Sequence, residues 1–195
     1  MGKIERAFYL QENVVAAARG LIGKVIYSMV DGERTAGIIT ETEAYAGQKD
    51  KASHAYGGKK TPRNSPMFGI GGYSYVYLCY GIHHLFNIVT NMPGTPHAVL
   101  IRGIHPIEGL DVIARRRAPA RPTTAGPGTL TQALGIRTAH TALDLCGDLI
   151  WIEDQGIRVA DEDVMVGPRI GVDYAGEDAL LPYRFLVQPS RLQIP

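Results

Sequence analysis

The chain has 195 residues, 45% of them hydrophobic, and a formal net charge of +1. This length can bury one sizeable core and is short for two, so we expect a single domain spanning residues 1–195. No segment approaches the roughly 18 consecutive apolar residues of a membrane span, and residues 1–10 lack the order of a signal peptide. We therefore expect a soluble, intracellular, cytoplasmic protein. Cys79 and Cys146 have no partners at metal-ligand spacing, which argues against a zinc site or disulfide framework and predicts two small core residues.

The small net charge hides two oppositely charged segments. Residues 49–121 carry ten Lys and Arg against three acids, whereas residues 142–180 carry ten acids against two arginines. A basic face of this kind can hold a polyanion while the acidic face is repelled from it. Charge runs are also common on ordinary solvated surfaces, so the pattern alone leaves that alternative open.

The first elements are expected to be a helix and a β-hairpin. Apolar residues along 10–19 predict a helix, with Gly20 as its left-handed C-cap. Strands are predicted at 24–30 and 36–44, joined by a tight turn at 31–32.

The middle of the chain is expected to hold a loop and three strands. A glycine-rich loop, with at most one helical turn at 50–55, leads to a tyrosine-rich segment at 73–80 that alternates at strand spacing. Apolar runs at 85–89 and 98–104 predict two further strands, which would complete an antiparallel set of three.

The remainder combines helices with short strands. Pro106 is expected to open a helix that fades into the arginines at 115–117, and 118–127 has the composition of a mobile loop. A short helix is predicted at 129–134, and apolar runs within 148–189 suit strands that complete the sheet. Helices and hairpins without a regular strand–helix rhythm predict an α+β fold and not a doubly wound parallel sheet.

Two glutamates lie close together in the predicted strand at 36–44. In an extended segment Glu41, Glu43 and Tyr45 share one face, with the two carboxylates on the order of 7 Å apart. Such a pair can be catalytic, or it can be an exposed strand edge that forms salt bridges to arginine. These residues alone favour the strand edge.

The tyrosine-rich strand offers ring faces to a flat ligand. Tyr75 and Tyr77 share one strand face, although packing in the core is the commoner use of such a strand. Tyr80 stands directly before Gly81 at a predicted hairpin tip. This place suits insertion between stacked bases better than it suits a core.

Several blocks of the sequence match one known family in order and spacing. They cover about 130 positions and are far more specific together than a single motif. The blocks are Glu41 to Tyr45, Ser53-His54, Gly57-Gly58, Thr61 to Asn64, Met67-Phe68, Tyr75 to Tyr77, Tyr80-Gly81, Asn87-Ile88, Val99 to Arg102, Gly126 to Gly128, Leu130, Gln132 to Leu134 and Arg169 to Val172. The chain thereby resembles the alkyladenine (3-methyladenine) DNA glycosylase family over nearly its whole length.

The resemblance implies a monofunctional enzyme of base excision repair. Such an enzyme flips an alkylated or deaminated purine, such as 3-methyladenine, out of duplex DNA and hydrolyses its N-glycosidic bond, leaving an abasic site. By this resemblance Glu43 is the general base that activates the attacking water, and Arg102 helps to orient that water. No metal or cofactor is expected, and the expected partner is damaged double-stranded DNA, bound by a monomer that is nucleoid-associated if the source is bacterial.

The resemblance also assigns the pocket and the fold. Tyr45, His54 and Tyr77 match the walls that stack around the flipped base. Asn87 matches the residue that screens guanine-like bases, and Tyr80 matches the intercalating wedge. The implied α+β domain has a mixed, mostly antiparallel curved sheet, flanking helices and a protruding hairpin that enters DNA.

One position departs from the family pattern. Thr129 stands where family members often carry lysine, so we expect one phosphate contact fewer and a salt dependence of binding lower by about one unit. The arginines at 115–117 and Arg121 are expected to compensate as a flexible clamp on the DNA backbone.

Alternative functions remain open from the sequence. The protein could bind lesions without cutting, or Glu41 and Glu43 could be the paired carboxylates of a sugar hydrolase. Strand nicking after base removal would require an amine nucleophile, for which Lys59 and Lys60 are the nearest candidates. Because both lie in a polar loop, we expect them to be solvated.

Overall fold

The computed structural model describes residues 2–119 and 123–195. Its strands are β1 (Gly2–Lys3), β2 (Val25–Ser28), β3 (Thr35–Tyr45), β4 (Ser74–Cys79), β5 (His83–Thr90), β6 (His97–Glu108), β7 (Ile150–Asp154), β8 (Val164–Gly167) and β9 (Arg184–Val187). Its α-helices are α1 (Arg6–Tyr9), α2 (Val14–Leu21), α3 (Leu110–Arg117) and α4 (Pro127–Leu134). Short 3-10 turns are η1 (Val30–Gly32), η2 (Gly47–Lys49), η3 (Tyr56–Gly58), η4 (Ser65–Phe68), η5 (Thr138–His140), η6 (Asp161–Asp163), η7 (Asp173–Leu180) and η8 (Pro189–Arg191).

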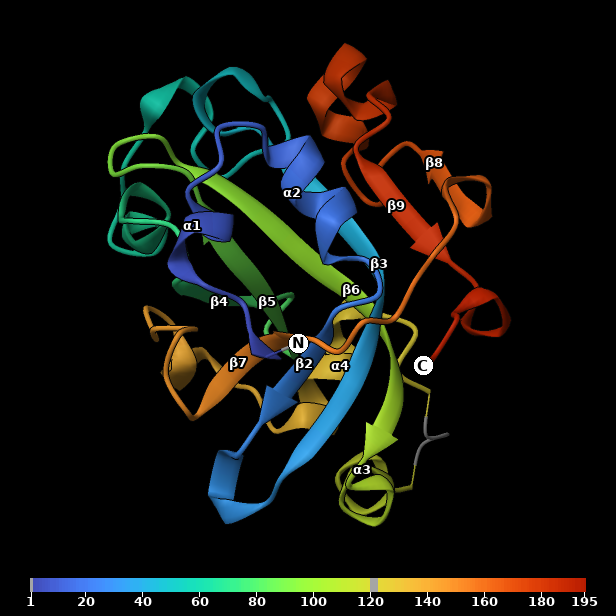
Figure 1. The fold of residues 1–195 in the computed structure, drawn as a ribbon. Coiled ribbons are helices and arrows are strands. Elements are labelled where there is room, and N and C mark those ends of the chain that lie inside the picture. Colours follow the sequence, from blue (N-terminus) through green and yellow to red (C-terminus); the bar gives the residue numbers. More distant parts are fainter. Residues whose placement is uncertain (1, 120–122) are drawn as a thin grey trace.

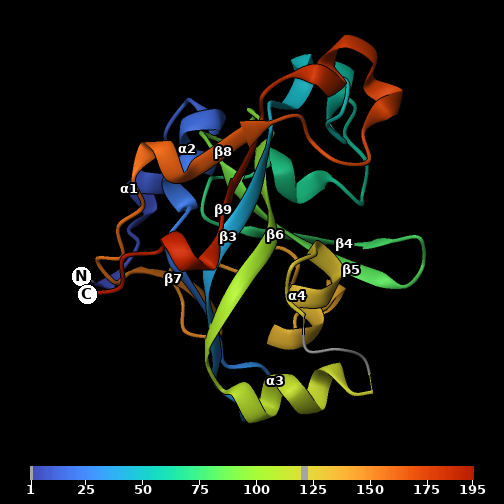
Figure 2. The same cartoon turned by 90° about the vertical axis from the view of Figure 1, so that its right-hand side faces the viewer.

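The strands form one curled antiparallel sheet. Its order is β1-β7-β2-β3-β6-β5-β4, and a branch leads from β3 through β9 to β8 (Figure 1). Figure 2 shows α2 on one side of β3 and β6 and α4 on the other, so helices cover both sides of the sheet. The predicted α+β class is confirmed. Within the described ranges no helix is both long and apolar enough to cross a bilayer.

The core lies between this sheet and its helices. Leu21 of α2, Phe86 of β5 and Leu130 of α4 belong to its largest cluster and have no exposed surface. Cys79 and Cys146 are both half-buried. Cys146 packs against the largest core cluster, whereas Cys79 lines a cavity, so the prediction of two core residues is wrong for Cys79.

Helix α2 begins and ends later than the sequence predicts. The Asn13 side chain accepts hydrogen bonds from two N–H groups of the first turn, at 3.0 and 3.1 Å, and so fixes where the helix begins. Gly20 lies inside the helix, where the Phe8 ring comes within 3.3 Å of the place that a Cβ would take. The predicted C-cap at Gly20 is therefore wrong. The left-handed residue that follows the helix is Gly23, with φ 85°.

Strand β3 carries both glutamates and lies inside the sheet. Its first half pairs with β2 in the predicted hairpin, and residues 41–43 pair with β9. Its other edge pairs with β6, with register shifts on both sides of Glu41. At this irregularity Thr40 of β3 and Arg102 of β6 have no directly opposite partner. A β-bulge of this kind changes the direction in which side chains point. The strand-edge interpretation of the glutamates is therefore wrong.

The helix expected to begin at Pro106 begins at Leu110 instead. Pro106 lies within β6 opposite Gly37, next to a register shift, and irregular positions of this kind tolerate the missing N–H of proline. The chain then turns at Gly109, whose φ is 70° and where a Cβ would lie 2.4 Å from the Arg34 carbonyl oxygen. Close contact with the connection between β2 and β3 thus determines where α3 begins. No local sequence signal predicts this starting point.

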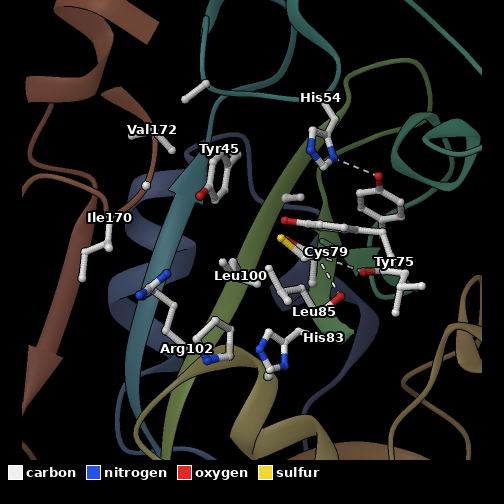
Figure 3. Close-up of a pocket in the computed structure, with 18 of the residues that line it drawn as sticks. Tyr45, His54, Tyr75, Cys79, His83, Leu85, Leu100, Arg102, Ile170 and Val172 are labelled. Carbon is white, nitrogen blue, oxygen red and sulfur yellow. Dashed lines mark hydrogen bonds between the residues drawn. The ribbon is translucent and has the colours of Figure 1, made fainter. Parts of the chain in front are cut away.

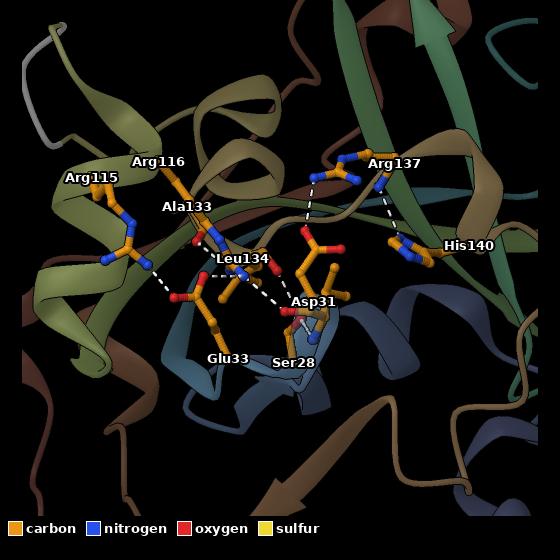
Figure 4. Close-up of polar contacts among 10 residues, drawn as sticks. Ser28, Asp31, Glu33, Arg115, Arg116, Ala133, Leu134, Arg137 and His140 are labelled. Carbon is orange, nitrogen blue, oxygen red and sulfur yellow. Dashed lines mark hydrogen bonds and ion pairs between the residues drawn. The ribbon is translucent and has the colours of Figure 1, made fainter.

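The arginines at the end of α3 contact the protein itself. The Arg116 side chain is 12% exposed, donates to carbonyl groups of η1 and α4, and pairs with Glu33, which Arg115 also contacts (Figure 4). Arg117 donates to a glutamine side chain of α4. Arg116 and Arg117 therefore hold α3 in place, and the expected flexible clamp is wrong for them. Arg121 lies outside the described residues.

Strands β4 and β5 form a hairpin that extends away from the rest of the molecule (Figure 2). At its tip Tyr80 and Gly81 are both left-handed, with φ 51° and 74°. Tyr80 is 91% exposed, whereas Tyr75 lower on the same strand is 2% exposed and packs in the core. The three antiparallel strands and the tyrosine at the hairpin tip are confirmed. Both chain termini lie on the side away from this hairpin (Figure 2).

Candidate active site

Glu43 is a carboxylate that the fold buries completely. Its side chain has no exposed surface. The Ile170 N–H donates to Oε1 at 2.7 Å, the Tyr45 hydroxyl donates to Oε2 at 2.8 Å, and Arg102 Nε lies 3.4 Å from Oε1. A buried charge is tolerated when its oxygens are bonded in this way. Because a carboxylate has about four acceptor positions, about one remains for a further donor such as water.

Burial raises the pKa of Glu43 above its ordinary value. Loss of solvation is the largest influence, and the Arg102 cation and the two donors Ile170 and Tyr45 oppose it. A carboxylate with a raised pKa accepts a proton more readily than an exposed one, which suits a general base. Buried carboxylates with shifted pKa values next to a cavity are typical of functional sites.

The raised pKa predicts that Glu43 costs stability at neutral pH. Between the ordinary carboxyl pKa and the raised one, the folded protein keeps a proton that the unfolded chain has released, so stability falls as pH rises through this window. Glu43→Gln does not titrate. We expect this variant to melt at a higher temperature than the parent protein at about pH 8, with the difference shrinking toward about pH 4. Melting curves of both proteins across this range test it, and a difference independent of pH contradicts it.

Glu41 supports the neighbouring arginine. Its Oε1 accepts from Arg102 Nε at 3.0 Å and from Arg184 Nε at 2.6 Å, and only 10% of its side chain is exposed. Arg102 therefore lies between the carboxylates of Glu41 and Glu43. This arrangement fixes the guanidinium in the wall of the site and gives Glu41 a role that the sequence left undefined.

A cavity of about 610 Å³ opens in front of Glu43. This volume is within the usual range of small-molecule sites, about 300–1,000 Å³. The three residues that contact the Glu43 oxygens, Tyr45, Arg102 and Ile170, all line it (Figure 3). Glu43 itself is not among the lining residues, so its carboxylate lies behind them. The structure brings the other predicted site residues together in this wall: Tyr45, His54, Tyr77, Tyr80, Asn87 and Arg102.

Aromatic rings form the wall opposite Tyr45 (Figure 3). The His54 and Tyr77 ring centroids are 4.7 Å apart, and His54 Nδ1 lies 2.9 Å from the Tyr75 hydroxyl oxygen. Loss of solvation and the nearby Arg63 cation lower the pKa of His54, so the imidazole is neutral at neutral pH. A neutral, electron-rich wall can stack on a flat cationic ring, whereas a charged imidazole would repel it.

Two polar residues lie at other parts of the wall. Asn87 is 4% exposed, and its Nδ2 donates to the Tyr75 carbonyl at 3.0 Å, which fixes the amide. Thr129 lies in the first turn of α4 and donates to the Gly126 carbonyl at 2.8 Å. The screening role of Asn87 and the phosphate contact that Thr129 lacks remain predictions.

For some residues of the site, the sequence predicts no role. The Ile170 N–H is a main-chain donor, so no residue type marks it, although it falls within a matched sequence block. Arg63 lies 4.9 Å from the Tyr77 ring centroid and was likewise inside a matched block without an assigned role. Arg184 reaches Glu41 from β9, and no local pattern predicts that contact.

The geometry suits chemistry on a flat ring compound, because a buried carboxylate lies behind an aromatic-walled cavity. A family model described as Methylpurine-DNA glycosylase (MPG) matches residues 7–191. The chain belongs to this family of N-glycosyl hydrolases that act on DNA.

Individual relatives agree. A protein from Chlamydia abortus is 44% identical over 188 residues, covering 94% of this chain and 97% of the relative. One from Bacillus cereus is 41% identical over 92% of both chains, and one from Desulfitobacterium hafniense is 38% identical over 98% of both. Each bears the name "Putative 3-methyladenine DNA glycosylase".

Proposed function

We propose that this protein is a monofunctional DNA glycosylase that removes 3-methyladenine and other alkylated or deaminated purines from duplex DNA. The damaged nucleotide flips out of the stack into the cavity between Tyr45 and Tyr77, and Tyr80 fills the gap that it leaves. Glu43 activates the water, and Arg102 orients it. The reaction leaves an abasic site for base excision repair.

The placement of Glu43 carries this proposal. Its carboxylate oxygens are contacted by Tyr45, Arg102 and Ile170, which all line the cavity. A water held there by Arg102 can donate to the remaining acceptor position of Glu43. The Glu43 side chain has no exposed surface, so bulk solvent does not compete for this position.

The chemistry follows from these positions. The water oxygen forms a bond to C1′ while the bond from C1′ to the purine nitrogen breaks, and the electron pair of that bond leaves with the purine. The water proton passes to the Glu43 carboxylate. Before transfer, the negative charge of Glu43 lies close to the positive charge that develops on the sugar. Positive charge on an alkylated purine weakens the bond further, and the aromatic walls retain such a base.

The rival activities fit the geometry less well. Paired carboxylates of a sugar hydrolase face each other across the substrate, whereas Arg102 Nε lies 3.0 Å from Glu41 and 3.4 Å from Glu43. Strand nicking needs an amine at the sugar. Among the residues that the structure describes, no lysine lines the cavity, and Lys59 and Lys60 are exposed in the loop after η3.

An excision assay tests the proposal. We expect the purified protein to release free 3-methyladenine from a defined duplex and to leave sites that break only after alkali treatment. Duplexes with 7-methylguanine, hypoxanthine or ethenoadenine establish the substrate range. Tight binding of the lesion duplex without base release would show a recognition module instead. A covalent protein–DNA adduct trapped by borohydride during turnover would show that the enzyme also nicks the strand.

A further inference from the structure

Arg169 and Asp50 form an ion pair inside the protein, next to the candidate active site. Their side chains are 0% and 1% exposed. Nη1 and Nη2 of Arg169 donate to the two carboxylate oxygens of Asp50 at 2.5 and 2.8 Å. The N–H groups of Ala46 and Ala52 donate to the same oxygens, at 2.9 and 3.0 Å. Asp50, held by Arg169, therefore links the end of β3 to the loop that follows this strand.

The guanidinium of Arg169 also holds an active-site ring. It lies 4.8 Å from the ring centroid of Tyr45 and 5.2 Å from that of Tyr183, while Nη1 donates to the Ala44 carbonyl at 2.9 Å. Stacking on a planar cation fixes the plane of a tyrosine ring. The hydroxyl of the Tyr45 ring is the donor to Glu43 Oε2.

The main chain beside Arg169 supplies the second donor. Ile170 follows Arg169 directly, and its N–H donates to Glu43 Oε1 at 2.7 Å. Two of the three contacts on the Glu43 oxygens thus come from groups that Arg169 holds in place. The third contact, from Arg102, comes from β6 and is independent of the pair.

We propose that Arg169, fixed by Asp50, is a positioning residue that aims the Tyr45 hydroxyl and the Ile170 N–H at Glu43. This role rests on the proposed function of Glu43 as the general base. Arg169 itself is not among the residues that line the cavity. Stability alone is a weak reason for such a pair, because well-packed apolar residues often replace a buried ion pair without loss. Lysine cannot take the same role, since it lacks the planar fork that binds Asp50 and stacks on the ring.

The test replaces both members of the pair. We expect Asp50→Leu with Arg169→Met to fold, because the double variant leaves no unpaired buried charge. The rate of base release in a single turnover should fall on the order of 10²-fold, as displaced catalytic groups typically cause. The acid limb of the pH–rate profile should also move to higher pH, because hydrogen bonds from Tyr45 and Ile170 favour the ionised form of Glu43.

A second pair, which is more exposed, provides a control away from the cavity. Arg6 binds both oxygens of Asp144 at 2.7 Å and lies 5.0 Å from the ring centroid of Tyr73, but none of these three residues lines the cavity. Arg6→Met with Asp144→Leu should leave the pH–rate profile unchanged. If the double variant at Asp50 and Arg169 does not fold, Arg169→Lys, which keeps the charge beside Asp50, tests the positioning role instead. The measurements are again the single-turnover rate and the pH–rate profile.

The outcomes separate this proposal from the one on which it rests. A wild-type rate and an unshifted pH profile in a folded variant of Arg169 would overturn the positioning role, even if Glu43→Gln is inactive. An active Glu43→Gln protein would overturn the role of Glu43 as general base, and the positioning role of Arg169 would fall with it. Loss of thermal stability with an unchanged rate and profile would show that the pair serves the fold alone.

Discussion

Glu43→Gln is expected to lower the rate of free-base release on the order of 10²- to 10⁴-fold, the usual contribution of a general base. The substitution keeps the shape of the side chain, and its amide oxygen can still accept from the Ile170 N–H. The Tyr45 hydroxyl, which now donates to Oε2, can turn and accept from the new amide. The fold and the aromatic cavity should therefore persist, and binding of a lesion duplex should be retained. Single-turnover release of 3-methyladenine, measured beside duplex binding, checks both parts.

Glu41→Gln is the matched control, because this residue lies two positions away on the same strand and also contacts Arg102, while its second partner is Arg184 of β9. We expect it to lower the rate much less than Glu43→Gln. Equal losses in the two variants would show that the orientation of Arg102, and not the proton acceptor, dominates the rate. Full activity of Glu43→Gln would exclude Glu43 as the base.

The raised pKa of Glu43 also sets the acid side of the activity profile. Only the ionised carboxylate can accept a proton, so the rate should fall as pH decreases through this raised pKa, at a higher pH than for an exposed carboxyl. The residual rate of Glu43→Gln should lack this limb. The pH–rate profiles of the two proteins are compared on a lesion that is cationic at every pH of the series. Protonation of the damaged purine then does not contribute to the profile.

Local sequence signals were sufficient for much of the fold. The helix predicted at 129–134 is α4, which begins two residues earlier at Pro127 and ends before Gly135, a left-handed residue with φ 71°. The hairpins likewise follow from alternation and turn residues. The failures at Gly20 and Pro106 share a different cause, because contacts with distant segments decide the conformation there.

In the candidate site, too, the sequence predicts some residues, whereas contacts between distant segments determine the others. Matched blocks placed Glu43, Tyr77 and Arg102 on three strands that the sheet brings together. The Ile170 N–H reaches Glu43 across 127 positions of sequence, and Arg184 reaches Glu41 across 143. Contacts of this range depend on how β9 and the segment before it fold back on β3. Residue types cannot reveal them, so the surroundings of the carboxylate required the structure.

Tyr80→Gly is expected to slow base release from duplex DNA on the order of 10- to 100-fold, which corresponds to the loss of about 1–3 kcal/mol of stacking. The ring is 91% exposed and makes no packing contact that the fold needs. Glycine suits the left-handed backbone at this position, where φ is 51°, so the hairpin should keep its shape. Single-turnover rates on a lesion in duplex DNA, compared with the parent protein, measure the effect.

The decisive comparison is the same lesion in single-stranded DNA. A wedge acts by filling the gap that the flipped nucleotide leaves in a stacked duplex, and a single strand offers no such gap. The loss caused by Tyr80→Gly should therefore be confined to the duplex, and Tyr80→Trp should restore the duplex rate because a larger ring can fill the same space. Tyr56, which is 48% exposed and does not line the cavity, supplies the control Tyr56→Ala, for which no change is expected. Equal losses on both substrates would place Tyr80 in the binding of the base or backbone, and the hairpin would then hold DNA without entering it.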